Sequence, residues 1–267
     1  MHWSEAAPAK LNLALHVRRR RADGYHDLET LFAFTEFGDR LEMRPADDWG
    51  LTIAGPMGAG PMGAGLAASP DNLVLAAARA FAAQTGCRQR FAFHLVKHIP
   101  VAAGLGGGSA DAAAALRLLA RATGEGSGML EEIAAGIGAD VAACVRSETC
   151  VGSGRGERLS PAPALAGTPV LLVNPGTALA TGPVFAGWDG HDLSPLGDWR
   201  SGRNDLEAPA IRLCPAVSDV LCWLRQQPGA TVVRMSGSGA TCFALFSGPV
   251  PHVQPPGGWW WRKSVLR

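Results

Sequence analysis

Apolar and polar residues alternate along the start of the chain. Every second residue from 11 to 17 is leucine or valine, and the intervening positions include an asparagine and a histidine. This period of two predicts a half-buried β-strand over residues 9–17. The dipeptide Asp23-Gly24 predicts a turn, and residues 28–37 after it are predicted to form a second strand.

The pattern then becomes helical over residues 73–85, where Gly86 stops the run, and over the alanine- and leucine-rich residues 110–122. Pro100 ends a strand that alternates over residues 91–97. The remaining predicted elements are helices over residues 127–135 and 216–226 and strands over residues 170–173 and 241–246.

Strands and helices do not alternate in clean βαβ units, which favours an α+β arrangement over a doubly wound sheet. The proline-rich residues 160–169 are the predicted domain boundary, giving an N-terminal domain over residues 1–159 and a C-terminal domain over residues 160–267. The sequence Gly-Pro-Met-Gly-Ala occurs twice within residues 55–65, and this short repeat predicts a flexible loop. The tryptophan-rich tail at residues 259–261 predicts a C-terminal strand packed against a domain.

Composition narrows the function classes. The 267 residues carry a formal net charge of +1 and are 47% hydrophobic, which is typical of a globular protein without the electrostatic footprint of nucleic-acid binding. The basic run at residues 18–21 fits a solvated strand end or hairpin. The chain shows no secretory signal and no membrane-spanning run, and its six cysteines lack metal-site spacing. We therefore expect a cytoplasmic protein with free thiols.

The glycine-rich residues 104–109, ahead of a predicted helix, carry the strongest chemical signal. Glycines let successive backbone amides turn toward one point, and the helix end adds its own amides and positive dipole, so the segment predicts a phosphate site. Ser109 is placed to cap the helix and to offer a hydroxyl to phosphate or Mg²⁺. The spacing fits neither a Walker A loop nor a Rossmann fingerprint. A plain flexible connection is the alternative.

A second glycine cluster occupies residues 236–239 and precedes a predicted strand, so a helix dipole is not available to it. Its small residues suit close packing against another loop, including the first glycine loop, and a simple tight turn is the alternative.

Four polar or aromatic residues are candidates for chemistry. Asp140 precedes an apolar run, where it acts either as a helix cap or as a base. Lys10 lies in an apolar strand, where it either faces solvent or supports charge on a transferring phosphoryl group. Tyr25 and His26 follow the predicted turn and are suited to stack on and hydrogen-bond a base, or are simply exposed.

Together these motifs resemble the GHMP kinases, named for galactokinase, homoserine kinase, mevalonate kinase and phosphomevalonate kinase. The resemblance covers nearly the whole chain, from about residue 8 to residue 246. It rests on Pro-Ala-Lys-Leu-Asn at residues 8–12, Arg-Ala-Asp-Gly-Tyr-His at residues 21–26, the glycine loop, Gly-Ala-Asp-Val at residues 138–141 and Ser-Gly-Ser-Gly-Ala at residues 236–240.

The resemblance implies a two-domain GHMP kinase fold with the active site in the interdomain cleft. It also implies transfer of a phosphoryl group from Mg·ATP to the 2-hydroxyl of a cytidyl-linked methylerythritol, in non-mevalonate isoprenoid synthesis. Asp140 would be the general base, with Lys10 supporting it, and Ser109 would lie near the metal. The nucleotide would meet Asn72, Lys97, Pro100, Val101, Ala102, Ala103, Gly104, Leu105, Gly106, Gly107, Gly108, Ser109 and Ala110. The cytidyl substrate would meet Asn12, Tyr25, His26, Thr181 and Phe185.

The chain departs from the family pattern at four places. Ala142 stands where a proline is usual, Gly182 separates Thr181 from Pro183, Arg155 stands where a smaller apolar residue is common, and the tail differs most. Two other functions remain open at this point. One is a GHMP kinase acting on homoserine or a mevalonate derivative, and the other is an inactive nucleotide-binding protein on the same scaffold.

Overall fold

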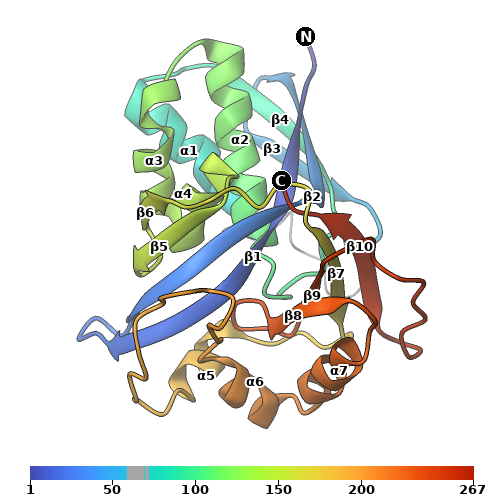
Figure 1. Ribbon diagram of the computed structural model, residues 1–267. Coiled ribbons are helices and arrows are strands. Elements are labelled where there is room, and N and C mark those ends of the chain that lie inside the picture. The colour runs from blue at the N-terminus through green and yellow to red at the C-terminus, as the bar shows by residue number, and fades with distance from the viewer. Residues whose placement is uncertain (59–68, 70–71) are drawn as a thin grey trace. The chain divides into compact units, whose positions relative to one another are not determined.

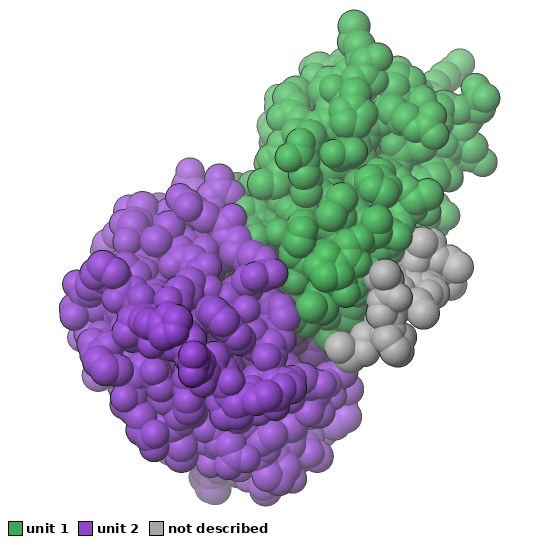
Figure 2. Space-filling view, turned by 90° about the vertical axis from the view of Figure 1, so that its right-hand side faces the viewer, with its two compact units in different colours: residues 1–9, 38–101, 106–147 green, residues 10–37, 102–105, 148–267 purple. Residues whose placement is uncertain are grey.

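A computed structural model of the chain describes residues 1–58, 69 and 72–267. The chain divides into two compact units, which Figure 2 shows in different colours. Unit 1 comprises residues 1–9, 38–101 and 106–147, and unit 2 comprises residues 10–37, 102–105 and 148–267. Both units are discontinuous in sequence because two long strands, β1 (Trp3–Arg20) and β2 (His26–Ala46), contribute residues to each.

Unit 1 combines a sheet with a layer of helices. Residues 40–46 of β2 pair antiparallel with β4 (Arg90–Val96), and β4 pairs parallel with β3 (Gly50–Ala54). Helix α1 packs against α2, and α4 packs against both α2 and α3 (Figure 1). The helices are α1 (Leu73–Thr85), α2 (Gly107–Thr123), α3 (Leu130–Ile137) and α4 (Ala139–Arg146), with a 3₁₀ turn at Ser127–Met129 before α3.

Unit 2 contains two antiparallel groups of strands. Strand β2 pairs with β1 and with β5 (Cys150–Gly154), which pairs with β6 (Arg158–Pro161). The second sheet has the order β10 (Trp260–Val265), β7 (Pro169–Asn174), β9 (Cys242–Phe246) and β8 (Ala230–Met235). The chain between β7 and β8 forms the helices α5 (Thr181–Ala186), α6 (Glu207–Leu213) and α7 (Ala216–Arg225). Helix α7 packs against β8 and β9 (Figure 1).

The predicted α+β class is confirmed, and each predicted helix or strand overlaps an observed one, but β3, β5, β6, β8, α4, α5 and α6 were not predicted. Helix α1 has the predicted bounds because both ends are specified: Asn72 accepts a hydrogen bond from Val74 N, and Gly86 ends the helix at a φ of 74°. The tail forms the predicted C-terminal strand, β10, paired with β7. Both N-terminal strands are longer than their alternating segments.

One local prediction is wrong. Helix α2 begins at Gly107, and its N-cap is Gly106 in the left-handed region, so Ser109 is the third helical residue and does not cap the helix. Gly107 and Gly108 therefore belong to the first turn of the helix, because left-handed Gly106 lets the helix begin three residues earlier than predicted.

Two predictions stay open. The repeat at residues 55–65 lies mostly outside the described residues, and the boundary at residue 160 remains a prediction. Of the described residues, no helix is both long enough and apolar enough to span a membrane.

Candidate active site

The N-terminal turn of α2 presents backbone amides suited to phosphate. The first helical hydrogen bond runs from Ala110 N to Gly106 O at 2.8 Å, so the amides of Gly107, Gly108 and Ser109 precede the helical ladder. Such amides and the positive end of the helix dipole together favour anions. Gly108 is exposed and its two neighbours are half-buried, so an anion has access to this end of the helix.

The middle of the glycine loop packs against the second glycine cluster within unit 2, as the small residues predicted. Ser236 Oγ donates to Gly104 O at 2.9 Å, and Thr241 N donates to Ala103 O at 3.1 Å. Gly104 has a φ of +76°, and a β-carbon there would lie 2.8 Å from Gly239 O. Glycine is therefore required at position 104 for both its backbone and its close contact.

The side chain of buried Asn204 holds the backbone of the second glycine cluster through hydrogen bonds. Its side-chain Nδ2 donates to Met235 O and to Gly237 O, each at 2.8 Å, and its Oδ1 accepts from Leu206 N at 2.9 Å. This one amide therefore holds the backbone on both sides of Ser236, the residue that contacts the first loop.

Lys10 is buried, so the solvent-facing interpretation is wrong. Its side chain is 3% exposed, its ammonium donates to Asn12 Oδ1 at 2.7 Å, and the same ammonium lies 5.2 Å from the centre of the Phe32 ring. Asn12 is itself fixed, because its Nδ2 donates to Thr30 Oγ1 at 2.8 Å and its backbone amide donates to Ser236 Oγ at 3.2 Å. The predicted substrate contact Asn12 thus orients Lys10.

Asp140 lies in the first turn of α4 and is half-buried. The N-cap of that helix is Gly138, which has extended backbone and makes no side-chain cap hydrogen bond. Asp140 therefore does not occupy the cap position that the alternative interpretation gave it. Ala142, in place of the usual proline, is an interior residue of the same helix, where it keeps the backbone amide that proline would remove.

Lys97 belongs to a buried ionic cluster. Its ammonium lies 2.5 Å from Asp39 Oδ2 and 2.6 Å from Asp111 Oδ2, and all three side chains are nearly inaccessible. Burial opposes the charged lysine, but the two carboxylates outweigh it and raise the pKa of Lys97. Burial also raises the pKa of Asp111 to about 7, against the opposing effect of Lys97.

His26 and Phe185 meet in an aromatic group of unit 2. Their ring centres are 5.1 Å apart, and Trp188 meets the imidazole edge to face at 5.7 Å. Arg20 Nε donates to His26 Nε2 at 3.4 Å, which leaves the proton of a neutral ring on Nδ1. Burial, followed by the charge of Arg20, lowers the pKa of His26, so the ring is neutral at pH 7.

Tyr25 is 56% exposed and directly precedes His26, the first residue of β2. The guanidinium of Arg155 lies over its ring, 5.0 Å from the centre. Thr181 begins α5, and its Oγ1 lies 3.1 Å from Ser238 Oγ in the second glycine cluster. Among the predicted substrate contacts in unit 2, His26 therefore meets Phe185, and Thr181 meets Ser238.

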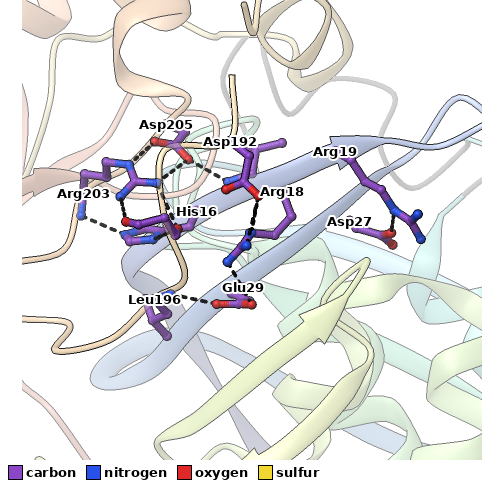
Figure 3. A network of polar contacts seen from close by, with 11 residues as sticks. His16, Arg18, Arg19, Asp27, Glu29, Asp192, Leu196, Arg203 and Asp205 are labelled. Atoms are coloured by element: carbon purple, nitrogen blue, oxygen red, sulfur yellow. Dashed lines mark hydrogen bonds and ion pairs between the residues drawn. The ribbon is translucent and has the colours of Figure 1, made fainter. Parts of the chain in front are cut away.

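A polar network supports the strands that carry these residues (Figure 3). Arg18 on β1 pairs with Glu29 on β2 at 3.2 Å and with Asp192 at 2.9 Å. Glu29 also accepts from Leu196 N at 2.7 Å, and Asp205 accepts from Val17 N at 2.8 Å. The segment around residues 192–205 is thus tied to the hairpin that ends at Tyr25 and His26.

Several residues of this site were not predicted. Asp39 and Asn204 lie in segments whose local pattern predicts only a strand or a turn, and their roles come from partners distant in sequence. Asp111 did leave a signal, since it is the one charged residue in the otherwise apolar residues 110–116. A lone acid on an all-apolar helix face indicates a buried partner.

The chain matches two family models: "GHMP kinases N terminal domain" over residues 72–148 and "GHMP kinases C terminal" over residues 186–253. It is 52% identical to a 4-diphosphocytidyl-2-C-methyl-D-erythritol kinase of Rhizorhabdus wittichii, with 100% of the chain and 96% of the relative aligned. A protein of the same name from Novosphingobium aromaticivorans is 49% identical, with 100% of the chain and 94% of the relative aligned.

Solved structures of kinases are similar to this chain as well. A crystal structure of a 4-(cytidine 5'-diphospho)-2C-methyl-D-erythritol kinase is 34% identical and superposes with a TM-score of 0.76, covering 99% of each chain. A homoserine kinase from Cytophaga hutchinsonii is 19% identical with a TM-score of 0.69, covering 91% of this chain and 84% of that one, and it shows the shared fold alone.

Proposed function

Because the chain belongs to the GHMP kinases, and within them to the 4-diphosphocytidyl-2-C-methyl-D-erythritol kinases, we propose that it phosphorylates that cytidyl compound. The donor is ATP, the acceptor is the 2-hydroxyl of the methylerythritol moiety, and the product serves non-mevalonate isoprenoid synthesis. The observation that carries the proposal is the full-length identity of about half to relatives of that name.

The nucleotide would bind through residues 100–110, which include the glycine loop. The amides of Gly107, Gly108 and Ser109 support this role, because they precede the helical hydrogen bonds at a helix end that attracts phosphate. Asn72 and Lys97 would contact the adenosine portion of ATP. Both lie at ends of elements, Asn72 as the N-cap of α1 and Lys97 just after β4.

Mg²⁺ would accompany ATP, with Ser109 as its protein ligand. The fit is reasonable because a hydroxyl is the hard oxygen donor that Mg²⁺ accepts, and Ser109 lies in the turn where the phosphates would bind. Among the described residues, no group of three or more His, Cys, Asp or Glu side chains could hold a metal. The ion would be held by Ser109, phosphate oxygens and water, and it would neutralise phosphate charge.

The phosphoryl transfer needs one proton to move. Asp140 would accept the proton of the acceptor 2-hydroxyl as its oxygen bonds to the γ-phosphorus and ADP leaves with the electrons of the broken bond. Lys10 would support the ionised carboxylate and the charge on the transferring group. The hydrogen bond from Lys10 to Asn12 gives the ammonium a fixed direction, which such electrostatic support requires.

The cytidyl acceptor would be recognised by Asn12, Tyr25, His26, Thr181 and Phe185. Cytosine would stack between the rings of Tyr25 and Phe185, and the Nδ1–H of neutral His26 would donate to an acceptor atom of the base. A site with buried donors rejects acceptors that lack a base, because those donors would then lose their partners. This requirement disfavours homoserine and mevalonate as substrates.

A coupled assay of ADP release tests the proposal. The enzyme, with Mg·ATP, is given the cytidyl compound, mevalonate or homoserine at matched concentrations. We expect the cytidyl compound to be turned over with the highest kcat/KM. Faster turnover of either competitor would contradict the proposal, and ATP binding without ADP release on any acceptor would favour an inactive nucleotide-binding protein.

A further inference from the structure

The two ends of the glycine loop are joined through one buried ionic cluster. Lys97 precedes the loop, and Asp111 is the fifth residue of α2, which follows it. The ammonium of Lys97 lies 2.6 Å from Asp111 Oδ2, so this ion pair closes the chain segment that contains the loop. On its other side the same ammonium pairs with Asp39 at 2.5 Å.

Asp39 fixes the entry to the loop as well. Its Oδ1 accepts from the backbone amides of His98 at 2.5 Å and of Ile99 at 2.8 Å. One carboxylate thus holds both the lysine side chain and the backbone that leads into the loop. Asp39, Lys97 and Asp111 together form what we term the clasp.

The clasp lies directly against the phosphate-binding turn. A β-carbon built on Gly107 would lie 3.0 Å from Lys97 Nζ and 3.2 Å from Ile99 Cγ2. The equivalent position on Gly108 would meet only Leu73, at an ordinary 3.5 Å. The first residue of α2 therefore rests on the lysine and on the loop entry, and their positions determine where the helix begins.

The clasp is a poor device for stability alone. The three side chains are 0% to 6% exposed, two carboxylates face one ammonium, and Asp111 Oδ1 is buried without a hydrogen-bond partner in the structure. Apolar side chains of similar size are often as stabilising as a buried ion pair. What an ion pair supplies and an apolar contact does not is a defined direction and distance.

We propose that Asp39, Lys97 and Asp111 are positioning residues that hold the two ends of the glycine loop in register, so that the amides of Gly107–Ser109 are aimed at the phosphates of ATP. This inference rests on the proposed function only in taking ATP as the nucleotide. Asp39 and Asp111 act through the loop and touch no substrate.

The test measures binding of ATP and of adenosine, without any acceptor, to the wild type and to Asp111→Leu. The substitution removes one of the two acceptors of Lys97 but leaves the balanced pair of Lys97 and Asp39, so no charge is left unpaired. We expect the Kd for ATP to rise by about tenfold, because the phosphates use the loop amides, while the Kd for adenosine stays within about twofold, because Lys97, its proposed contact, remains paired with Asp39. Asp111→Asn keeps an oxygen acceptor and should restore most of the ATP affinity.

A folded Asp111→Leu variant with wild-type ATP affinity would overturn the proposal. So would an equal loss of ATP and adenosine affinity, which would indicate general damage. If Asp111→Leu does not fold, the comparison of Gly107→Ala with Gly108→Ala replaces it. Both add one methyl in the same turn, and only the first presses on Lys97, so the proposal requires the larger loss of ATP affinity in Gly107→Ala.

These binding measurements need no acceptor substrate. A failure of the cytidyl compound to be phosphorylated would therefore contradict the proposed function and leave the result for the clasp unchanged.

Discussion

The guanidinium carbon of Arg155 lies 5.0 Å from the centre of the Tyr25 ring, on the face of an aromatic side chain that is otherwise half-exposed. Sheet register produces this contact, because Gly154 at the end of β5 pairs with Leu28 near the start of β2. Glu157 steadies the turn by accepting from Arg155 N at 2.6 Å. The residue that departs from the family pattern thus supports the ring proposed to stack on cytosine.

Replacing Arg155 with methionine keeps the aliphatic stem and removes the cation. An exposed cation–π contact is worth about 0.5–1 kcal/mol, so we expect the KM for the cytidyl acceptor to rise about two- to fivefold with an unchanged KM for ATP. Steady-state kinetics measure both constants. Arg90→Met is the matched control, since Arg90 stacks on Trp49 at 5.1 Å in unit 1. A similar acceptor effect from both substitutions would rule out a specific role for Arg155.

Gly104→Ala should weaken ATP binding through the contact between the two glycine loops. Gly86 is the control, because its φ of +74° nearly equals the +76° at Gly104, but a β-carbon there would meet nothing within 4 Å. Gly86→Ala should therefore cost only the backbone strain of about 1 kcal/mol, seen in urea unfolding, with an unchanged KM for ATP.

Gly104→Ala adds overpacking of about 1–3 kcal/mol to that strain. Because the loop must move to relieve it, we expect the KM for ATP to rise about tenfold. If both variants lost the same free energy of unfolding and kept the wild-type KM for ATP, the second glycine cluster would not position the glycine loop.

Asp140→Asn should nearly abolish turnover and leave ATP affinity intact. Loss of a general base costs about 10²- to 10⁴-fold in kcat. Asp219→Asn supplies the control, because Asp219 also lies in the first turn of a helix, α7. Removing a charge from either helix should lower stability by similar small amounts of about 0.3–1 kcal/mol. If Asp140→Asn retained most of its kcat, the carboxylate would have only a helix-stabilising role.

His26 makes folding and acceptor binding sensitive to acid. Burial lowers its pKa below the ordinary value of 6.5, so between the folded and unfolded pKa values the unfolded chain binds more protons than the folded chain. Stability contributed by neutral His26 is therefore present above pH 6.5 and is lost as the pH falls below it.

We expect urea unfolding to show a smaller acid loss of stability in His26→Gln than in the wild type. The KM of the wild type for the cytidyl acceptor should rise over the same acid range. Protonated Nε2 can no longer accept the hydrogen bond from Arg20 Nε, so the ring loses the contact that holds it for the acceptor. Identical pH profiles for the wild type and the variant would show that His26 does not titrate in this way.

Local sequence patterns predicted the fold class and helices α1, α2, α3 and α7, because capping residues and glycines mark their ends, but the short helices α4, α5 and α6 were not predicted. Helix α1 is the clearest case, with Asn72 and Gly86 at its bounds. The start of α2 was predicted too late, because a run of glycines is typical of a loop. The helix begins at Gly107 because Gly106 adopts the left-handed conformation, which the sequence does not show.

The glycine loop, Lys10 and Asp140 were predictable as candidates, but their environments were not. A period of two places Lys10 opposite a leucine face, yet it cannot reveal that the lysine face is buried as well. The clasp depends on Asp39 and Asp111, which are 58 and 14 residues from Lys97. Such pairings are set by the tertiary fold, and no local periodicity encodes them.

Phosphorus NMR of the complete reaction tests the central proposal most directly. The enzyme is mixed with Mg·ATP and the cytidyl compound, and the phosphorus signals are followed to completion. We predict one new phosphomonoester signal that grows in equal amount with ADP, while the diphosphate of the cytidyl compound stays intact. Release of inorganic phosphate with ADP and no phosphomonoester, or cleavage of the acceptor's diphosphate, would contradict the proposed kinase reaction.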